Sequence, residues 1–148
     1  ALGTDALRRI EARVAASERT HTGELRVCVE AGLPLSYLWR GASARERAIA
    51  MFGKLRVWDT EQNNGVLIYL LLAEHRIEIV ADRAVARVVE EGHWAGIVGQ
   101  MAEAFRAGRY EAGLLTALDA VDSVLRQHFP RAAGAPDINE LPDRPVLR

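Results

Sequence analysis

Two patterns of apolar positions alternate along the 148-residue chain. Residues 24–30 and 76–81 place apolar and polar side chains in turn, and this period of two predicts half-buried strands. The run from 66 to 72 is apolar throughout, seven residues in a row, and predicts a strand buried on both faces. A membrane-spanning helix needs about 20 apolar residues, so we interpret this run as a core strand.

The first two predicted helices carry apolar residues at helical spacing. One helix spans residues 4–20, with Thr4 as its N-cap. The next begins at Ser43, and Glu46 three residues later fits a capping box, in which each side chain bonds the other residue's backbone amide. The stripe of this second helix that is predicted to face the core consists of Ile49, Phe52 and Leu55.

The predicted order of elements is helix, strand, helix, strand, strand, helix, helix, with the last two helices within residues 85–125. A helix joins the first two strands, so they should run parallel through a right-handed crossover. The short turn at 73–75 makes the second and third strands an antiparallel hairpin. The fold class is therefore α/β, a three-layer α/β/α sandwich with a small mixed sheet. We expect one domain over residues 1–130, followed by a proline-containing tail, 131–148, that lies on the surface or is disordered.

Polar residues cluster at the strand ends that this topology brings to one edge of the sheet. The candidate site consists of His21, Glu24, Asn63, Asn64, Asp82 and Arg83, with Thr22 beside them. Oxygen donors in such a place suit a hard cation or a phosphate group. The alternative is structural, because Asn63, Asn64 and Gly65 can simply form a turn and Asp82 can cap the following helix.

Residues 31–42 contain Gly32, Pro34 and Gly41, and this composition predicts a loop. The loop is unusually rich in large apolar side chains. They pack either into the core or against another protein, and the candidate partner surface is Leu35, Tyr37 and Trp39.

Composition narrows the possible chemistry. A net charge of −1 provides no basic footprint for nucleic acid. The single cysteine, Cys28, excludes an internal disulfide and a cysteine-based zinc site, and suits a reducing compartment. The sequence contains neither a glycine-rich phosphate loop nor a G-x-S-x-G elbow, and its four histidines lack metal-ligand spacing.

Three stretches together resemble the TPM domain family. They are NNGVLIYLLLAEHRIEIVAD at 63–82, TGELRV at 22–27, and a spaced run formed by Trp94, Ile97, Met101, Phe105, Gly108, Tyr110, Gly113 and Leu114. The resemblance implies an α/β/α sandwich. A plant thylakoid member of this family is described as an acid phosphatase, some members bind calcium at the strand ends, and others assist repair or assembly of membrane complexes.

The chain departs from the family pattern at the candidate site. Asn63 stands where the family often has Asp, and residues 81–85 replace a Gly-Tyr-Gly-Leu-Glu segment. We therefore expect a weak or empty site for calcium or magnesium, with Asp82 and Asn64 as the metal ligands.

The resemblance supports two functional hypotheses. The first is a non-catalytic module that binds a protein partner in the assembly or maintenance of membrane-associated complexes, with a weakly held divalent cation. The alternative is a metal-dependent acid-type phosphatase. The likeness is to a bacterial subgroup without a signal peptide or membrane anchor, and we expect a cytoplasmic protein, peripheral to the membrane. The short apolar run predicts no transmembrane segment, and the net charge predicts no nucleic-acid partner.

Overall fold

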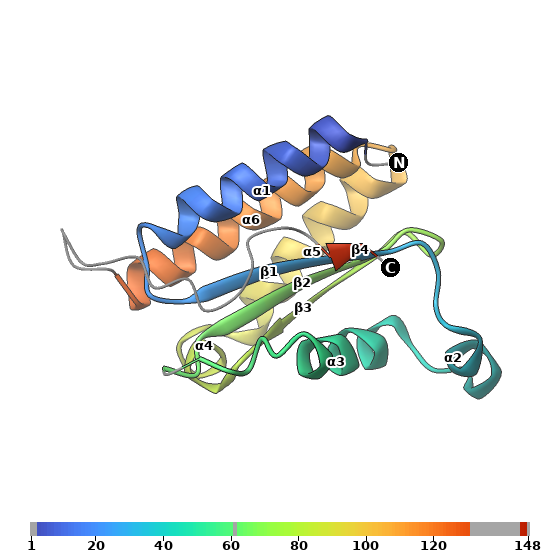
Figure 1. Ribbon diagram of the computed structural model, residues 1–148, viewed down its shortest axis with the longest axis horizontal. Helices are drawn as coiled ribbons and strands as arrows, with labels where there is room; N and C mark the ends of the chain where they lie inside the picture. Colours follow the sequence, from blue (N-terminus) through green and yellow to red (C-terminus); the bar gives the residue numbers. More distant parts are fainter. Residues whose placement is uncertain (1–2, 61, 131–145, 148) are drawn as a thin grey trace.

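The computed structural model describes residues 3–60, 62–130 and 146–147, and its centre is a mixed sheet (Figure 1). The strands lie in the order β3-β2-β1-β4. Their bounds are Glu24–Glu30 for β1, Gly65–Leu71 for β2, Arg76–Ala81 for β3 and Val146–Leu147 for β4. The apolar run predicted to be the central strand therefore forms β2, which lies between β1 and β3 and is buried along its whole length.

The pairing of the strands follows the predicted topology. β1 and β2 run parallel, with Glu24 opposite Gly65, and β2 and β3 form an antiparallel hairpin, with Val66 opposite Ala81. The start of β1, the start of β2 and the end of β3 consequently lie at the same end of the sheet. The prediction that these three chain segments converge is confirmed.

Helices cover both faces of the sheet (Figure 1). One layer consists of α1 (Thr4–Glu18), α5 (Glu91–Arg106) and α6 (Tyr110–His128), and its core cluster includes Ile10, Ile97 and Leu118. The other layer contains α3 (Ala44–Lys54), which packs over Leu67 and Tyr69. The α/β/α prediction is confirmed. No helix in the described parts of the chain is long and apolar enough to cross a membrane.

The strand β1 is not half-exposed as its alternating pattern predicted. All seven of its residues are buried, including Glu24, Arg26 and Glu30. β1 lies between β2 and β4, and its polar face is turned toward the α3 layer, where Arg47 bonds Glu30. Sequence alternation indicates which face is polar, but it does not show that another layer covers that face.

The predicted helix ends are correct in one case and wrong in the other. Ser43 is the N-cap of α3 and accepts a hydrogen bond from the backbone amide of Glu46 at 3.1 Å. The N-cap of α1 is Gly3 rather than Thr4, and no side chain caps this end.

The stripe predicted to face the core in α3 is wrong at Ile49, which is exposed, whereas Phe52 and Leu55 pack at the edge of the core cluster. The buried residues of this helix are Ala44, Arg47, Ala48 and Met51. Small residues let the helix approach the sheet closely, and the buried arginine is paired with a carboxylate of β1.

Two segments predicted to lack regular structure contain short elements. Within the predicted loop 31–42, residues Leu35–Arg40 form helix α2. At the end of the predicted tail, Val146–Leu147 form β4, which pairs in parallel with Cys28 and Val29. The structure places residues 146–147 of the predicted tail in the sheet, whereas residues 131–145 lie outside the described part of the chain.

Candidate functional site

The predicted strand-end site begins at a tight backbone junction. The amide of Asp82 donates to the carbonyl of Gly65 at 2.9 Å, and Glu24 lies opposite Gly65 in the parallel pair. A side chain at position 65 would not fit, because its Cβ would lie 2.0 Å from the carbonyl oxygen of Val57. Gly65 is thus required for the loop before β2 to pass close to the first turn after α3.

The loop before β2 orients Asn64 through a relay of hydrogen bonds. Asn63 has a left-handed φ of 53°, a conformation that Asn tolerates better than most residues. The side-chain nitrogen of Asn64 donates to Thr22 Oγ1 at 3.2 Å, and Thr22 in turn donates to Gln62 at 3.0 Å. The side-chain oxygen of Asn64 is buried and has no hydrogen-bond partner among the residues that the structure describes.

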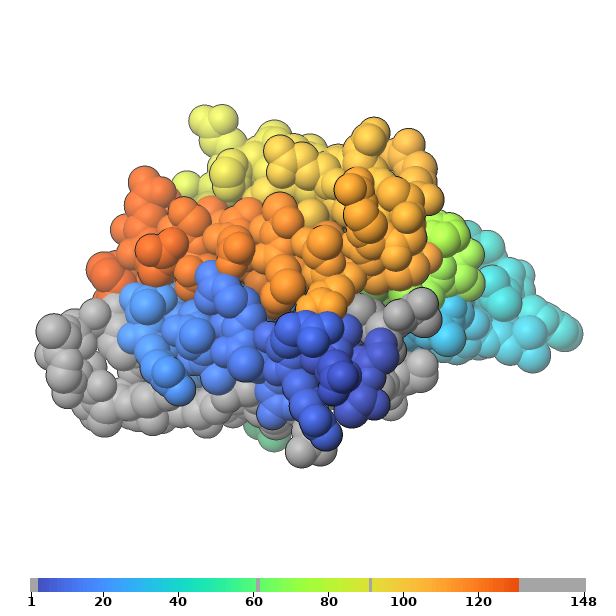
Figure 2. Space-filling view, turned by 90° about the horizontal axis from the view of Figure 1, so that it is seen from above, coloured from blue at the N-terminus to red at the C-terminus, as the bar shows by residue number. Residues whose placement is uncertain are grey.

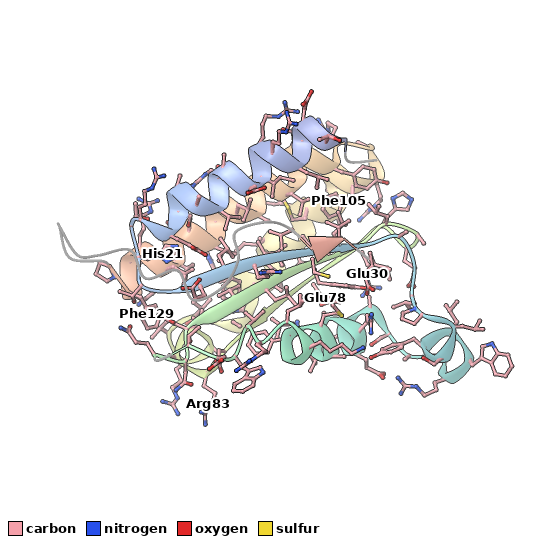
Figure 3. The ribbon with its side chains drawn as sticks, viewed as in Figure 1. His21, Glu30, Glu78, Arg83, Phe105 and Phe129 are labelled. Carbon is pink, nitrogen blue, oxygen red and sulfur yellow. The ribbon has the colours of Figure 1, made fainter. Side chains whose placement is uncertain are left out.

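Asp82 is the N-cap of α4 (Arg83–Val88). Its Oδ1 accepts a hydrogen bond from the backbone amide of Arg83 at 2.7 Å. Its Oδ2 is buried and, within the described part of the chain, has no hydrogen-bond partner. The side chain of Arg83 is exposed and points away from the sheet (Figure 3). Asp82 therefore has the capping role proposed from the sequence. Its Oδ2 remains available for another donor or a cation.

The residues at this end fit a divalent cation only partly. Two buried oxygens without hydrogen-bond donors, from Asn64 and Asp82, are the kind of ligand that calcium or magnesium takes. Calcium takes six to eight oxygens, so most of its shell would be main-chain carbonyls and water. Within the described ranges, no group of three or more His, Cys, Asp or Glu side chains is placed to hold a metal.

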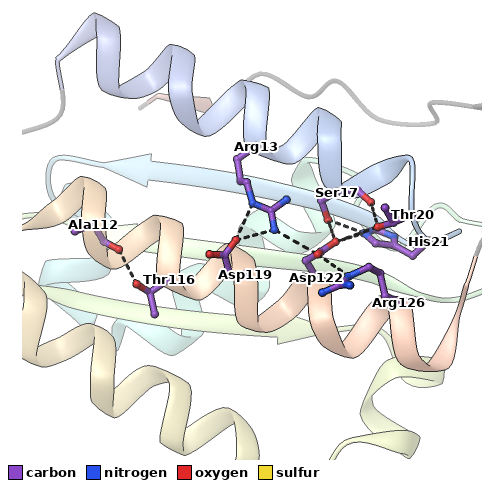
Figure 4. Close-up of polar contacts among 9 residues, drawn as sticks. All are labelled: Arg13, Ser17, Thr20, His21, Ala112, Thr116, Asp119, Asp122 and Arg126. Carbon is purple, nitrogen blue, oxygen red and sulfur yellow. Dashed lines mark hydrogen bonds and ion pairs between the residues drawn. The ribbon is translucent and has the colours of Figure 1, made fainter.

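His21 does not join this site, because its side chain is fully buried beside α1 and α6 (Figures 3 and 4). Its Nε2 lies 2.8 Å from Ser17 Oγ, and Ser17 donates its proton to Asp122. Because the hydroxyl proton is already used, the imidazole nitrogen is the donor to Ser17. In a hydrolase the serine gives its proton to the histidine. Here Ser17 donates to Asp122 instead, so we interpret this buried Ser-His-Asp group as structural.

The charge of Asp122 is stabilised by its neighbours (Figure 4). Burial raises the pKa of Asp122, but hydrogen bonds from Ser17 and Arg13 and the charges of Arg126 and Arg13 lower it further, so that the pKa lies below its ordinary value. The carboxylate therefore joins the end of α1 to α6 and stays ionised.

The second candidate surface is helix α2, which projects from the opposite end of the molecule (Figures 1 and 2). Leu35 is 66% exposed, Leu38 56% and Trp39 84%. We call these three residues the α2 patch. Tyr37, which the sequence placed in this surface, is only partly exposed, and Leu38 takes its place.

Tyr37 instead lies between two arginines. Its ring centroid is 4.9 Å from the guanidinium carbon of Arg40 and 5.1 Å from that of Arg47. Arg47 makes two hydrogen bonds to Glu30, at 2.7 and 2.9 Å. Tyr69 donates a third hydrogen bond to Glu30 at 2.7 Å.

The groups in this network hold their charge states firmly. The hydrogen bond to Glu30 is the main reason that the pKa of Arg47 is raised above its ordinary value. Burial, followed by the hydrogen bond to Glu30, raises the pKa of Tyr69. Arg47 is thus a cation and Tyr69 a neutral phenol at any physiological pH.

Sequence reasoning missed both buried polar groups, Glu30–Arg47–Tyr69 and Ser17–His21–Asp122. A signal was present for the first, because Arg47 falls on the same helical stripe as Ala44, Ala48 and Met51. A charged residue on such a stripe needs a buried partner. The identity of that partner depends on tertiary contacts between residues 17 positions apart.

Comparison with known proteins identifies the fold and the family. A family model described as the TPM domain matches residues 1–124. The chain belongs to the TPM domain family. The resemblance derived from residues 22–27 and 63–82 is therefore confirmed. Among curated protein sequences no match is found.

Two solved structures share the fold of this TPM domain. The BA42 protein from the psychrophilic bacterium Bizionia argentinensis, solved by NMR, has a TM-score of 0.84 and 24% identity, over 99% of this chain and 95% of that one. The N-terminal domain of a protein from P. gingivalis, also solved by NMR, has a TM-score of 0.69 and 20% identity, over 88% of this chain and 82% of that one. At these identities the likeness shows the fold alone.

Proposed function

We propose that this TPM domain is a non-catalytic module that binds a protein partner in the assembly or maintenance of membrane-associated complexes. The observation that carries the proposal is the α2 patch, in which three large apolar side chains project into solvent from a six-residue helix. Full burial of one such side chain contributes about 1.5–3 kcal/mol, and exposed tryptophans are common anchors of binding energy at interfaces.

The shape and charge of α2 define the partner surface that would fit it. α2 is a narrow projection (Figure 2), so a concave pocket buries more of the patch than a flat surface does. Residues 31–42 contain no acidic side chain and one basic side chain, Arg40. Arg40 already approaches Glu46 of α3 at 3.8 Å, so the patch carries no unbalanced charge, and the proposed occupant is a protein with an apolar pocket.

The proposal also covers location and cation. We propose a location in the cytoplasm, peripheral to the membrane. Asn64 and Asp82 each have a buried oxygen without a hydrogen-bond partner among the described residues, and these two oxygens support a weakly bound calcium or magnesium ion. In this scheme the cation stabilises the loop before β2 and takes no part in a reaction.

A matched pair of tryptophans tests the main proposal. Trp39 and Trp58 are both exposed, at 84% and 49%, but Trp58 lies after α3 rather than in the α2 patch. Affinity capture from the native host, with partners counted by mass spectrometry, should lose a specific protein in Trp39→Ala and retain it in Trp58→Ala. Equal loss or equal retention in both variants contradicts the proposal.

A lipid control separates a protein partner from a membrane. The wild-type domain is mixed with vesicles of phosphatidylcholine and phosphatidylserine and then sedimented. We expect the protein to remain in the supernatant. Co-sedimentation that disappears in Trp39→Ala would assign the patch to lipid instead.

A metal-dependent acid-type phosphatase is the second candidate, and the two unpartnered oxygens are the observation in its favour. Its weakness is that His21, one candidate for proton transfer, is fully buried and bonded to Ser17. We expect no turnover of p-nitrophenyl phosphate above background, with or without calcium or magnesium. Activity that is lost in Asp82→Ala but kept in Glu90→Ala would establish the phosphatase instead.

A further inference from the structure

We infer that Tyr37 is the positioning residue of the α2 patch, and that the clamp of Arg40 and Arg47 on its ring presents the patch in one preformed orientation. The inference rests on the proposed function, because it concerns the same surface. It adds a mechanism by which a residue that does not face the partner sets the affinity for it.

Helix α2 cannot hold its position by itself. It has six residues, none of them buried, and isolated helices shorter than about 12–15 residues are marginal in water. Pro34 begins the helix and Gly41, with a φ of 64°, ends it, where the amide of Ala42 donates to the carbonyl of Tyr37. These local bonds close the helical turn, but they do not set its direction relative to the sheet.

Contacts with the rest of the domain must therefore orient α2. Leu33, just before the helix, packs at the edge of the core cluster under α3. Within the helix, the Tyr37 ring lies between the two guanidinium groups. Arg40 also approaches Glu46 of α3 at 3.8 Å, so both sides of the clamp connect α2 to α3.

The inner side of the clamp is fixed to the sheet. Arg47 is buried and makes a bidentate pair with Glu30, the last residue of β1. The planar pairing of a guanidinium with a carboxylate restrains both position and angle. Because Tyr69 of β2 holds the same carboxylate, Arg47 cannot move with α2 when the helix swings outward. Tyr37 must then leave the Arg47 face whenever α2 departs from its observed orientation.

This arrangement has a quantitative consequence for binding. The apparent dissociation constant of a protein equals the intrinsic value divided by the fraction of molecules in the binding-competent state. If loss of the clamp lowers that fraction from nearly all molecules to about one in ten, partner affinity falls about tenfold. The three residues of the patch remain chemically unchanged in such a variant.

Amide hydrogen exchange on the isolated domain tests the inference without a partner. In Tyr37→Ala we expect the amides of residues 37–42 to exchange about tenfold faster or more, with the β1 and β2 amides unchanged. Tyr37→Phe retains the ring but loses the hydroxyl, which also hydrogen-bonds Arg47, so its exchange should be clearly slower than in Tyr37→Ala and close to the wild type. Arg40→Gln removes the outer half of the clamp and should give an intermediate rate. Trp39→Ala, which alters the patch but not the clamp, should leave these rates as in the wild type.

The outcomes separate this inference from the proposed function. Wild-type exchange rates in Tyr37→Ala, or rates in Tyr37→Phe as fast as in Tyr37→Ala, overturn the positioning role of the ring. Partner capture that survives Trp39→Ala overturns the proposed function, whereas the exchange result is measured without any partner and is unaffected by it.

Discussion

At the end of the sheet nearest α2, the buried carboxylate of Glu30 receives three hydrogen bonds, two from Arg47 and one from Tyr69 (Figure 3). At the other end, Asn64 and Asp82 each keep a buried oxygen that has no hydrogen-bond partner within the described residues. Both ends combine polar side chains with tight packing. They differ in whether the protein itself supplies the partners.

This difference separates a structural polar group from a candidate ligand site. A fully bonded buried network is rigid and can support the structure outside it. Here it holds Arg47, one side of the clamp on Tyr37. A buried oxygen without a donor carries a desolvation cost of about 1–3 kcal/mol that a cation or a water molecule can offset. We therefore propose a supporting role for the Glu30 end and weak ligand binding at the Asp82 end.

The largest expected effect is at the fully bonded end. Arg47→Ala leaves the carboxylate of Glu30 buried without its cation, and loss of one partner of a buried pair costs about 3–5 kcal/mol. Urea denaturation measures the change in the free energy of unfolding. Lys54→Ala is the control, because Lys54 is on the same helix but exposed, and it should cost no more than about 0.5 kcal/mol. Equal losses in both variants would show that the buried network contributes no more stability than an exposed side chain of the same helix.

A second buried carboxylate, Asp122, tests whether full bonding is also what stabilises the α1–α6 contact. Asp122→Ala should cost about 1.5–3 kcal/mol at neutral pH, because hydrogen bonds to a charged group are lost. The pKa of Asp122 is lower in the folded protein than its ordinary value of 3.8. Its contribution is therefore fully present above that value and is lost as the pH falls through the folded-state pKa.

The pH dependence of Asp122 can be isolated with a neutral substitution. Thermal unfolding followed from neutral to acid pH should show a shallower loss of stability in Asp122→Asn than in the wild type. Asp119→Asn is the control, since Asp119 is largely exposed. An acid transition that is unchanged in Asp122→Asn would mean that other carboxylates dominate it.

At the incompletely bonded end the expected effects are smaller. Asp82→Ala removes the N-cap of α4 and should cost about 0.5–2 kcal/mol. Asp82→Ser can still accept from the helix amide, so it should retain most of this stability. Thermal or urea unfolding of the two variants measures the difference, and equal destabilisation would argue against the capping role.

Calorimetric titration with calcium sharpens the same comparison. We expect weak binding, because Asn64 and Asp82 are the candidate side-chain ligands and most of the shell would be carbonyl groups and water. Binding in the micromolar range that Asp82→Asn abolishes would show instead a well-formed cation site at the end of β3.

The smallest expected effect is in the α2 patch. Trp39→Ala should change the free energy of unfolding by no more than about 0.5 kcal/mol, because Trp39 is 84% exposed and belongs to no core cluster. Chemical denaturation provides the measurement. A loss of several kcal/mol would reveal that the side chain is needed for folding, and the patch would lose its main support as a binding surface.

Local pattern was sufficient for much of this fold. The uniformly apolar run at 66–72 identified the central strand, and the connection of β1 to β2 through a helix identified a parallel pair. The convergence of Glu24, Asn64 and Asp82 at one end followed from that topology alone. These predictions succeeded because hydrophobic periodicity and chain connectivity act over short distances in sequence.

Other features depended on contacts between distant segments. The alternation of β1 predicted an exposed polar face, but β4 lies beside this strand and the α3 layer covers that face. His21 was assigned to the strand-end site by position, yet its side chain turns to Ser17 and Asp122. The direction of a side chain at the end of an element depends on which donors and acceptors the neighbouring elements bring.

The sequence by itself therefore determined the family, the α/β/α architecture and the segments that meet at each end of the sheet. Only the tertiary structure decided that Leu35, Leu38 and Trp39 face solvent while Tyr37 faces Arg47. It also decided which buried polar atoms are bonded and which are not. The physical reason is that periodicity reports the face a residue lies on, whereas exposure and hydrogen bonding depend on residues of other elements that the chain brings to that face.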